Sequence, residues 1–412
     1  MEQGSEKTVA ILSPSLTGGG AERAAGKLAT SLQGKVAELY FFCLYPDEGN
    51  YEYSGKLIDF GFGRIRDKYI KYGRRIFHLR IALEYIMLPY RVKKEKVRLG
   101  IDITISFLDL MGIINILSKA NDRVVVSVRI AHSYSGNFLK ELKTKNIREA
   151  ILNQLVYRYY EMADKVVAVS KAIALSMIKD YDLDIKKVVS IGNSVDAETI
   201  RKQAAEPFGN SEKKFYKEHK VIINVGRLNK QKNQARLISI FKEIKKKDCD
   251  YGLIIVGSGD EENSLKELCV NAGIMNDVRF IPYTSNPYKY VANADLFMLT
   301  SDYEGYPNVV IEAMACRVPV ASVDCKTGPR EILSDGKDII FIDENGKRCK
   351  KGLLIPFDAG DDAIANAVIE MMNDKKYIEQ ITHNAFNFSS LSYFISTMKT
   401  KLRVPTVLSD MG

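Results

Sequence analysis

The sequence of 412 residues lacks the features that mark membrane-spanning, secreted and disordered chains. No apolar run approaches the roughly 18–20 residues that a membrane-spanning helix requires. Only 11 prolines and no long low-complexity run leave little room for disorder. Residues 1–7 are polar, so we expect no signal peptide. These absences predict a globular protein, and its length favours two or more domains.

Cysteine and histidine are also sparse and unclustered. The six cysteines contain no C-x-x-C pair and lie within or beside apolar segments, so neither a disulfide framework nor a cysteine metal site is expected. A reducing cytosol fits this usage. Asp-x-Asp triplets occur at 180–182, 182–184 and 248–250, where they end helices or precede a strand. We interpret them as chance, because a metal-binding triplet of this kind would end a buried strand.

The positive charge is concentrated in one segment. The chain has a net charge of +9, and residues 64–98 contain twelve Lys or Arg against three acidic residues, which equals the whole excess. From Tyr69 to Tyr90 the apolar residues recur at three-four spacing, which predicts one helical stripe. Two interpretations stay open: an ordinary surface helix whose stripe packs on a sheet, or a helix that lies in an anionic membrane surface. Nucleic-acid binding is disfavoured, because no RNP-like or zinc-finger signature accompanies the basic residues.

Strand-like apolar segments alternate with helical segments along the chain. The expected strands are 8–12, 37–44, 102–107, 123–128 and 165–170 in the first half, and 221–225, 251–256, 278–282, 296–299 and 318–323 in the second. A polar stretch without strand character, 197–219, separates the halves, so we expect the interdomain linker there. This alternation predicts an α/β fold with two doubly wound domains facing a cleft.

A loop that could hold a phosphate follows the first strand of each half. Glycines fill 18–20 before the first helix, and Arg227 and Lys232 lie in the basic loop 226–233. Backbone N–H groups at a helix start bind anions, and fixed cations beside them suit a pyrophosphate. The glycine loop is equally consistent with a plain tight turn. It fits neither a Walker loop nor the G-x-G-x-x-G fingerprint.

Two carboxylates flank a similar strand, loop and helix within residues 295–333. Glu304 lies in the loop and Glu312 about two turns further along the helix, among apolar neighbours. Solvent-exposed glutamates are the ordinary interpretation of such a pair. A carboxylate in an apolar helix is, however, unfavourable to bury without a partner, so we favour ligand contact. His132 follows the strand 123–128 at its carboxyl end, where either a site contact or a satisfied loop histidine remains open.

In this order the motifs resemble the retaining GT-B glycosyltransferases of family four. The strongest matches are EGYPNVVIEAMA (304–315) and GRLNKQKN (226–233), supported by GGGAER (18–23), NSVD (193–196), VGSGDE (256–261) and GPREIL (328–333). The resemblance implies Rossmann-like domains at 1–198 for the acceptor and 220–385 for the nucleotide sugar, with a linker at 199–219. A C-terminal helix within 386–412 would cross back and pack on the N-terminal domain. Arg317 stands where the family mostly has glycine.

The resemblance also implies roles for individual residues. Arg227 and Lys232 would bind the diphosphate, Glu312 the ribose hydroxyls and Glu304 the donor sugar. Further implied donor contacts are Gly19, Gly20, His132, Pro282, Gly305, Tyr306, Pro307, Asn308 and Val309. No metal or other cofactor is expected, because cations and helix starts would stabilise the leaving group.

We therefore expect a retaining transferase that moves a hexose or N-acetylhexosamine from a UDP-sugar to a lipid-linked or cell-surface glycan. It would work at the cytoplasmic face of the membrane, as a peripheral protein held through residues 64–98. One alternative is a non-hydrolysing sugar-nucleotide epimerase, which needs no acceptor. Another is a non-catalytic nucleotide-binding or scaffold protein, which would need none of Arg227, Lys232, Glu304 and Glu312.

Overall fold

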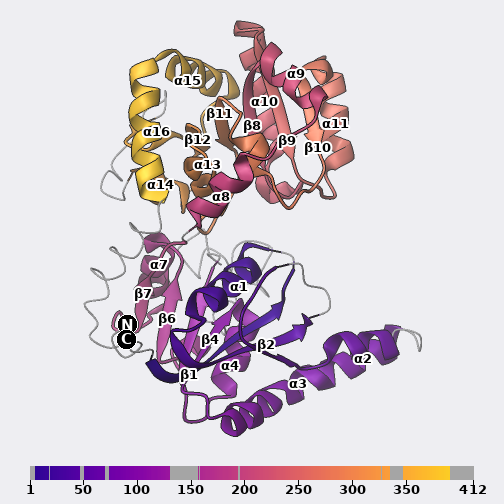
Figure 1. The fold of residues 1–412 in the computed structure, drawn as a ribbon, viewed down its shortest axis with the longest axis vertical. Coiled ribbons are helices and arrows are strands. Elements are labelled where there is room, and N and C mark those ends of the chain that lie inside the picture. The colour runs from indigo at the N-terminus through magenta and orange to yellow at the C-terminus, as the bar shows by residue number, and fades with distance from the viewer. Residues whose placement is uncertain are drawn as a thin grey trace. The chain divides into compact units, whose positions relative to one another are not determined.

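The computed structural model describes two compact units, each built on one sheet (Figure 1). The described residues are 5–17, 19–46, 51–69, 74–129, 156, 158–193, 195–325, 327–334 and 347–389. The units divide between Gly192 and Asn193. Within these described residues each sheet has seven strands with helices on both faces, which is the doubly wound α/β arrangement that the sequence predicts.

The first unit carries its first strand at the centre of its sheet. Its elements are β1 (Ser5–Ser15), α1 (Gly20–Leu32), β2 (Val36–Tyr45), β3 (Lys56–Asp59), α2 (Phe62–Tyr69), α3 (Arg74–Leu99), β4 (Ile103–Phe107), α4 (Asp109–Leu117), β5 (Arg123–Val128), β6 (Lys165–Ala168), α7 (Lys171–Tyr181) and β7 (Val188–Ser190). The strand order is β3-β2-β1-β4-β5-β6-β7, with every pair parallel. The order reverses between β1 and β4, the kind of switch point beside which α/β folds bind ligands.

Side chains that alternate along β1 account for the helices on both faces of this sheet. Val9 and Ile11 belong to the core under α1, whereas Ala10 and Leu12 belong to the core under α2, α3 and α4. All four are fully buried. A strand covered on both faces reads as a continuous apolar run, which is why this segment was recognisable in the sequence.

Helix α3 turns a different face to the sheet from the one that the three-four spacing suggested. Leu88 and Val92 are its fully buried apolar residues. The side chains of residues 69–77 lie outside the described part, but the rest of the expected stripe is exposed: Leu79 at 66%, Leu83 at 45%, Ile86 at 71% and Tyr90 at 66%. The interpretation in which that stripe packs on the sheet is therefore wrong. Helix α3 is apolar on two faces, and periodicity alone does not show which of them is buried. Among the described residues, none of the helices combines the length and apolar character needed to cross a bilayer.

A buried ion pair fixes the C-terminal end of α3 to the first unit. Lys96 Nζ lies 2.9 Å from Asp122 Oδ2, and both side chains are fully buried. Lys96 Nζ also donates to Asn115 Oδ1 at 2.7 Å, and Asn115 Nδ2 donates to the backbone oxygens of Thr104 and Val125. Burial lowers the pKa of Lys96, while the Asp122 carboxylate opposes that shift. Because a buried charge without its partner is strongly destabilising, this network holds α3 against the sheet.

The second unit also has the first strand of its sheet, in chain order, at the centre. Its elements are α8 (Ala197–Ala204), α9 (Asn210–Glu218), β8 (Lys220–Val225), η3 (Lys230–Lys232), α10 (Gln234–Lys247), β9 (Tyr251–Val256), α11 (Glu262–Asn271), η4 (Met275–Asp277), β10 (Val278–Ile281), α12 (Tyr288–Val291), β11 (Leu296–Leu299), α13 (Asn308–Ala315), β12 (Val320–Val323), α14 (Pro329–Ser334), β13 (Lys347–Cys349), β14 (Gly352–Ile355), α15 (Asp361–Asn373) and α16 (Lys375–Ser389). The strand order is β10-β9-β8-β11-β12-β14-β13. The pairs are parallel except β13 with β14.

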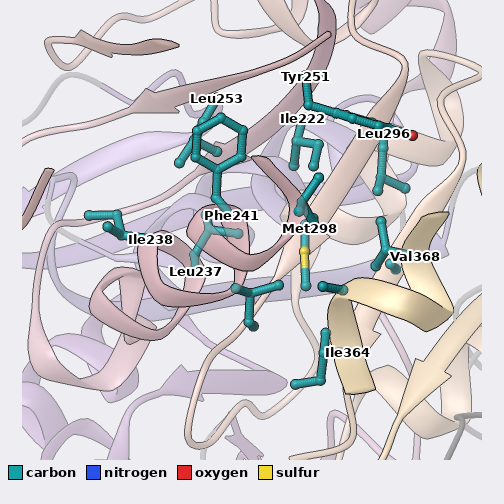
Figure 2. Close-up of a cluster of buried hydrophobic side chains, with 14 of the residues drawn as sticks. Ile222, Leu237, Ile238, Phe241, Tyr251, Leu253, Leu296, Met298, Ile364 and Val368 are labelled. Atoms are coloured by element: carbon teal, nitrogen blue, oxygen red, sulfur yellow. The ribbon is translucent and has the colours of Figure 1, made fainter. Parts of the chain in front are cut away.

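Two apolar cores enclose the second sheet. Figure 2 shows the first core, in which Phe241 of α10 and Val368 of α15 converge on Ile222 and Met298 of the strands. Ile223, the next residue along β8, points into the other core with α8, α13 and α14. The sheet is thus buried on both faces, which leaves its carboxyl edge and the loops there for ligands.

The stretch 199–219, expected as a linker, instead forms most of α8 and α9 of the second unit. Ile200 and Phe215 are each only 3% exposed and belong to the same core as α13. A short surface helix needs only one or two apolar anchors, so polar composition alone suggested a linker incorrectly. The division between the units accordingly falls earlier than predicted, before Asn193.

The segment expected to pack on the first domain begins within the second unit. Residues 386–389 end α16, and the ring of Phe386 lies under the guanidinium of Arg201. The guanidinium carbon of Arg317 lies 4.2 Å from the centroid of the same ring. Residues 390–412 lie outside the described residues. Arg317 has φ +60°, so the turn after α13 keeps the left-handed geometry that usually calls for glycine.

Candidate functional site

Two loops meet at the carboxyl edge of the second sheet. The basic loop, residues 226–233, follows β8, and the glutamate loop, residues 300–308, follows β11. The strands β8 and β11 are hydrogen-bonded parallel neighbours, and the strand order reverses between them. Segments some seventy positions apart in the sequence are therefore adjacent at the place where α/β folds bind ligands.

Hydrogen bonds join the two loops directly. The Asp302 N–H donates to the Gln231 backbone oxygen at 2.9 Å, and Gln231 Nε2 donates to the Tyr303 backbone oxygen at 3.0 Å. Asn233 Nδ2 donates to Asp302 Oδ1 at 2.7 Å, and Thr300 Oγ1 donates to the Asn233 backbone oxygen at 3.0 Å. The loops are thus fixed to each other by their own polar groups.

Lys232 and Glu304, which the sequence assigned to one site from separate motifs, form an ion pair. Lys232 Nζ lies 2.5 Å from Glu304 Oε1, and Ser301 Oγ donates to the same oxygen at 2.8 Å. Thr327 Oγ1 donates to the backbone oxygen of Glu304. Glu304 is only 7% exposed. The Lys232 ammonium balances the charge of its carboxylate, and the two donors fix its orientation.

The other two members of the predicted quartet belong to the same pair of loops and helices. Arg227 is the second residue of the basic loop and is exposed just beyond the carboxyl end of β8. Glu312 lies in α13, the helix that the glutamate loop enters, and is buried at 5% exposure. The burial that its apolar neighbours suggested is therefore observed.

The run from Gly305 to Val309 leads into the N-terminus of α13. Pro307 stands at the N-cap and Asn308 begins the helix. The first N–H groups of a helix lack partners within it and carry partial positive charge. With Arg227 and Lys232 nearby on the adjoining loop, this edge is suited chemically to an anion such as a diphosphate.

Asn193 secures the end of the glutamate loop, a role that the sequence did not reveal. Its Nδ2 donates to the Tyr306 backbone oxygen at 3.1 Å and to Asn308 Oδ1 at 2.6 Å. The NSVD motif was recognised only by resemblance. No periodicity or local spacing links Asn193 to a loop more than a hundred residues away.

Gly328 of the GPREIL turn supports the same loop from another side. Its φ is +51°, and a Cβ there would lie 2.6 Å from Pro307 Cδ and 3.0 Å from the Gly305 backbone oxygen. Arg330 just beyond it forms an ion pair with Asp324, which is 3% exposed. Glycine is required here by both backbone geometry and space.

A third loop, which follows β9 and contains Ser258 and Gly259, packs against the basic loop. The Leu228 N–H donates to the Ser258 backbone oxygen at 3.1 Å, and a Cβ on Gly259 would overlap the Leu228 backbone oxygen. Pro282 is exposed immediately after β10, and the next residue, Tyr283, donates its N–H to Ser258 Oγ at 3.0 Å. Pro282 therefore lies on a loop bonded to the VGSGDE segment, at the same edge of the sheet.

The remaining predicted contacts are not in this unit. Gly19 and Gly20 lie at the start of α1 in the first unit, where the Gly19 N–H donates to Glu22 Oε2 at 3.2 Å. Gly18 and His132 lie outside the described residues. The second unit thus brings together Arg227, Lys232, Pro282, Glu304, Gly305, Tyr306, Pro307, Asn308, Val309 and Glu312.

Burial and nearby carboxylates keep the two thiols near the site, those of Cys316 and Cys325, protonated and therefore unreactive. All six cysteines of the chain are free. Burial, with the Glu312 carboxylate nearby, raises the pKa of Cys316 to about 12. Burial, with Glu304 and Asp324 nearby, raises the pKa of Cys325 to about 12. Neither is a thiolate at neutral pH, so neither is suited to act as a nucleophile.

Replacing Asn193 by alanine should raise the donor KM by up to about 30-fold, because two hydrogen bonds of roughly 1 kcal/mol each, about 2 kcal/mol together, hold the glutamate loop. Steady-state kinetics with the donor would measure the change. Asn293→Ala is the matched control, since Asn293 Nδ2 also donates to a backbone oxygen, that of Lys289, at an exposed surface position. Equal KM values for the two variants would contradict the positioning role of Asn193.

Comparisons with known proteins relate the chain to glycosyltransferases. The family described as Glycosyl transferases group 1 matches residues 208–388, and Glycosyltransferase Family 4 matches residues 18–199. An uncharacterized glycosyltransferase of Methanocaldococcus jannaschii is 34% identical over 180 residues, 43% of this chain and 44% of that protein. The Campylobacter jejuni N-acetylgalactosamine-N,N'-diacetylbacillosaminyl-diphospho-undecaprenol 4-alpha-N-acetylgalactosaminyltransferase is 29% identical over 257 residues, 61% of this chain and 67% of that protein. The first of these matches therefore spans less than half of its relative.

Solved structures share the fold over nearly the whole chain. Anabaena HepE in complex with UDP has a TM-score of 0.66 at 17% identity, covering 97% of this chain and 100% of that one. WaaG, a glycosyltransferase involved in lipopolysaccharide biosynthesis, has a TM-score of 0.67 at 14% identity, with coverage of 97% and 100%. At such identities the likeness shows the fold alone, which is the two-domain GT-B fold.

Proposed function

Because the chain is a group 1 glycosyltransferase by its family matches, we propose that it transfers a hexose or N-acetylhexosamine from a UDP-sugar with retention of configuration. The observation that carries this proposal is the Lys232–Glu304 pair, held between two bonded loops beside the start of α13. This arrangement offers cations and helix N–H groups to a diphosphate and a fixed carboxylate to a sugar. UDP bound to HepE, a protein of the same fold, supports the choice of nucleotide.

In the proposed mechanism the residues of the second unit stabilise the leaving group. Arg227 and Lys232 bind the diphosphate, and the N-terminus of α13 adds its partial positive charge. The acceptor hydroxyl attacks the anomeric carbon from the face that the diphosphate leaves, and a departing phosphate oxygen takes the hydroxyl proton. These groups supply the stabilising charge from the protein, so the proposal assigns no role to a metal ion.

Glu304 has an orienting role in this mechanism rather than a nucleophilic one. Its Oε1 already accepts from Lys232 and Ser301. A carboxylate engaged by an ammonium and a hydroxyl is a weak nucleophile, but it is a well-fixed acceptor for sugar hydroxyls. Glu312 is assigned to the ribose by its place two turns further along α13.

The acceptor that we propose is a lipid-linked or cell-surface glycan, met at the cytoplasmic face of the membrane. The name of the Campylobacter relative includes a diphospho-undecaprenol acceptor, and WaaG is involved in lipopolysaccharide biosynthesis. Neither an epimerase nor a non-catalytic scaffold is favoured by the comparisons, whose named relatives are transferases.

Thermal unfolding against a panel of UDP-, GDP- and ADP-sugars, with a chelator present, tests the donor. We expect one or more UDP-sugars to raise the Tm with increasing concentration, because a ligand that binds only the folded state stabilises it by mass action. The Lys232→Ala variant should show a smaller rise at the same concentration. A preference for GDP- or ADP-sugars would overturn the UDP assignment, and a flat panel would overturn the site itself.

A further inference from the structure

Strands β8 and β11 diverge at the edge of the sheet where the basic loop and the glutamate loop begin. Their paired register ends with Ile223 opposite Phe297, whereas β8 stays paired with β9 as far as Val225 opposite Val256. The divergence lies at the reversal of the strand order, directly before the two loops in the chain. Backbone groups at this point need other partners, because a buried polar group without a hydrogen bond is unfavourable.

Two buried side-chain amides bridge this divergence. Asn224 and Gln234 are each only 1% exposed. Asn224 Nδ2 donates to the Met298 backbone oxygen of β11 at 2.7 Å. Gln234, the first residue of α10, donates from Nε2 to the Arg227 backbone oxygen at 3.1 Å, and the same nitrogen makes a longer contact of 3.5 Å with Asn224 Oδ1. The two amides thus connect β8, β11 and α10 to the basic loop.

The amide of Gln234 is satisfied on one side only. Its Oε1 is buried and accepts no hydrogen bond from any of the described residues. Reversing the amide would turn that oxygen toward two other acceptors, the Arg227 backbone oxygen and Asn224 Oδ1, so the network fixes the orientation. A buried acceptor without a donor is destabilising, and an apolar side chain of similar size would avoid that penalty. Packing alone therefore does not account for a glutamine here, which leaves its bond to the basic loop.

That bond helps to hold both polar atoms of the peptide group between Arg227 and Leu228. The oxygen of this peptide accepts from Gln234 Nε2, and its N–H donates to the Ser258 backbone oxygen at 3.1 Å. Because a peptide group is planar, two bonds on its opposite sides fix its orientation. The Arg227 side chain is itself exposed, so the direction in which it leaves the backbone depends on this peptide.

We propose that Gln234 is a positioning residue for Arg227. It holds the backbone of the basic loop so that the guanidinium is directed toward the donor diphosphate before the ligand arrives. Gln234 is buried and acts only through Arg227, without touching the ligand itself. A cation fixed in advance in this way binds and stabilises an anion better than one that must first be ordered. The inference rests on the proposed function, in which Arg227 binds the diphosphate.

A double-mutant cycle on the full chain tests the proposal, with the binding of UDP and, separately, of inorganic pyrophosphate measured by titration calorimetry. Gln234→Met removes the amide and keeps an unbranched side chain of similar length. It should weaken the binding of both ligands about three- to tenfold, the range expected for one hydrogen bond. In the Arg227→Ala background the same change should weaken binding by less than about twofold, because the side chain that Gln234 positions is absent.

Gln231→Met is the matched control, because Gln231 is a glutamine of the same loop whose Nε2 also donates to a backbone oxygen, that of Tyr303, at 3.0 Å. Its bond holds the glutamate loop, so its effect on binding should be the same with and without Arg227. Circular dichroism and the Tm without ligand show whether each variant is folded. Should Gln234→Met not fold, Gln234→Ala, which leaves room for water in place of the amide, enters the same cycle.

The outcomes separate this proposal from the proposed function. An equal loss of binding by Gln234→Met with and without Arg227, or no loss at all, would overturn the positioning role while leaving the donor assignment intact. If pyrophosphate binding shows the coupling but UDP binds no better than GDP or ADP, the nucleotide assignment is wrong and the role of Gln234 stands. Absence of binding of both UDP and pyrophosphate to the unchanged protein would overturn both.

Discussion

Replacing Lys232 by alanine should lower kcat/KM for sugar transfer by about 10²- to 10³-fold, the range measured when one preorganised donor to a developing charge is removed. Lys232 is a half-buried cation of the basic loop, and its Nζ lies 2.5 Å from Glu304 Oε1 of the glutamate loop. Its loss removes charge stabilisation from the departing diphosphate and leaves Glu304 with one donor fewer. Donor consumption and product formation, followed at several donor concentrations, would measure both kcat and KM.

Lys230→Ala provides the matched control for this experiment. Lys230 is in the same short η3 helix but is exposed to solvent. Its removal changes the local charge equally and should alter kcat/KM by less than about twofold, since exposed charges in water interact weakly. Circular dichroism should show both variants folded. A similar loss in both variants would mean that only the overall charge of the loop matters.

Replacing Gly257 by alanine should destabilise the second unit by about 2–6 kcal/mol, from strain of roughly 1–3 kcal/mol and a displaced neighbour of similar size. Gly257 has φ +148°, and a Cβ there would overlap the backbone oxygen of Gly226, the residue before Arg227. The basic loop would have to move, so donor binding should weaken as well. Urea unfolding and donor-dependent Tm shifts would measure the two effects.

Gly273→Ala separates backbone strain from the steric clash. Gly273 also has a positive φ, +70°, but nothing lies within 4 Å of the position of its missing Cβ. This control should lose only about 1–2 kcal/mol, the difference between left-handed and right-handed backbone for a residue with a Cβ. Donor binding should be unchanged. If Gly257→Ala proved no more destabilising than Gly273→Ala, the close approach of Gly257 to the backbone of Gly226 would be contradicted.

The sequence predicted the strands well because most of them are buried on both faces. Segments such as 251–256 and 296–299 are continuous apolar runs between polar loops, and both are strands in the structure. The two sheets and their alternating helices followed from that pattern. The order of strands within each sheet did not, because pairing of β1 with β4 depends on contacts far apart in the chain.

Helices at the surface were harder to predict. Helices α8 and α9 each rest on few buried residues, Ile200 and Phe215 among them, too few to outweigh a polar composition. In α3 the three-four spacing correctly indicated a helix but not which apolar face meets the sheet. Leu88, Val92 and Lys96 of α3 are buried, and the partner of Lys96 is Asp122, in the loop before β5, so the sequence of the helix alone does not show which face is covered.

Within the site, the residue types were predictable and their pairing was not. Glu304 and Lys232 were each recognised from their own motif, yet their ion pair joins positions 72 residues apart. The contacts of Asn193 with Tyr306 and Asn308 span still longer separations. Such contacts arise from the adjacency of parallel strands, and a single sequence carries no local signal of them.

The hydrogen bonds between the basic loop and the glutamate loop have a thermodynamic consequence for recognition. Asp302, Gln231 and Asn233 already fix the two loops against each other. A ligand that arrives there does not have to order either backbone, so it loses little conformational entropy of the protein on association. Its affinity can then come from the enthalpy of charged hydrogen bonds, and its rate of association is set by diffusion and orientation rather than by a folding step of the loops.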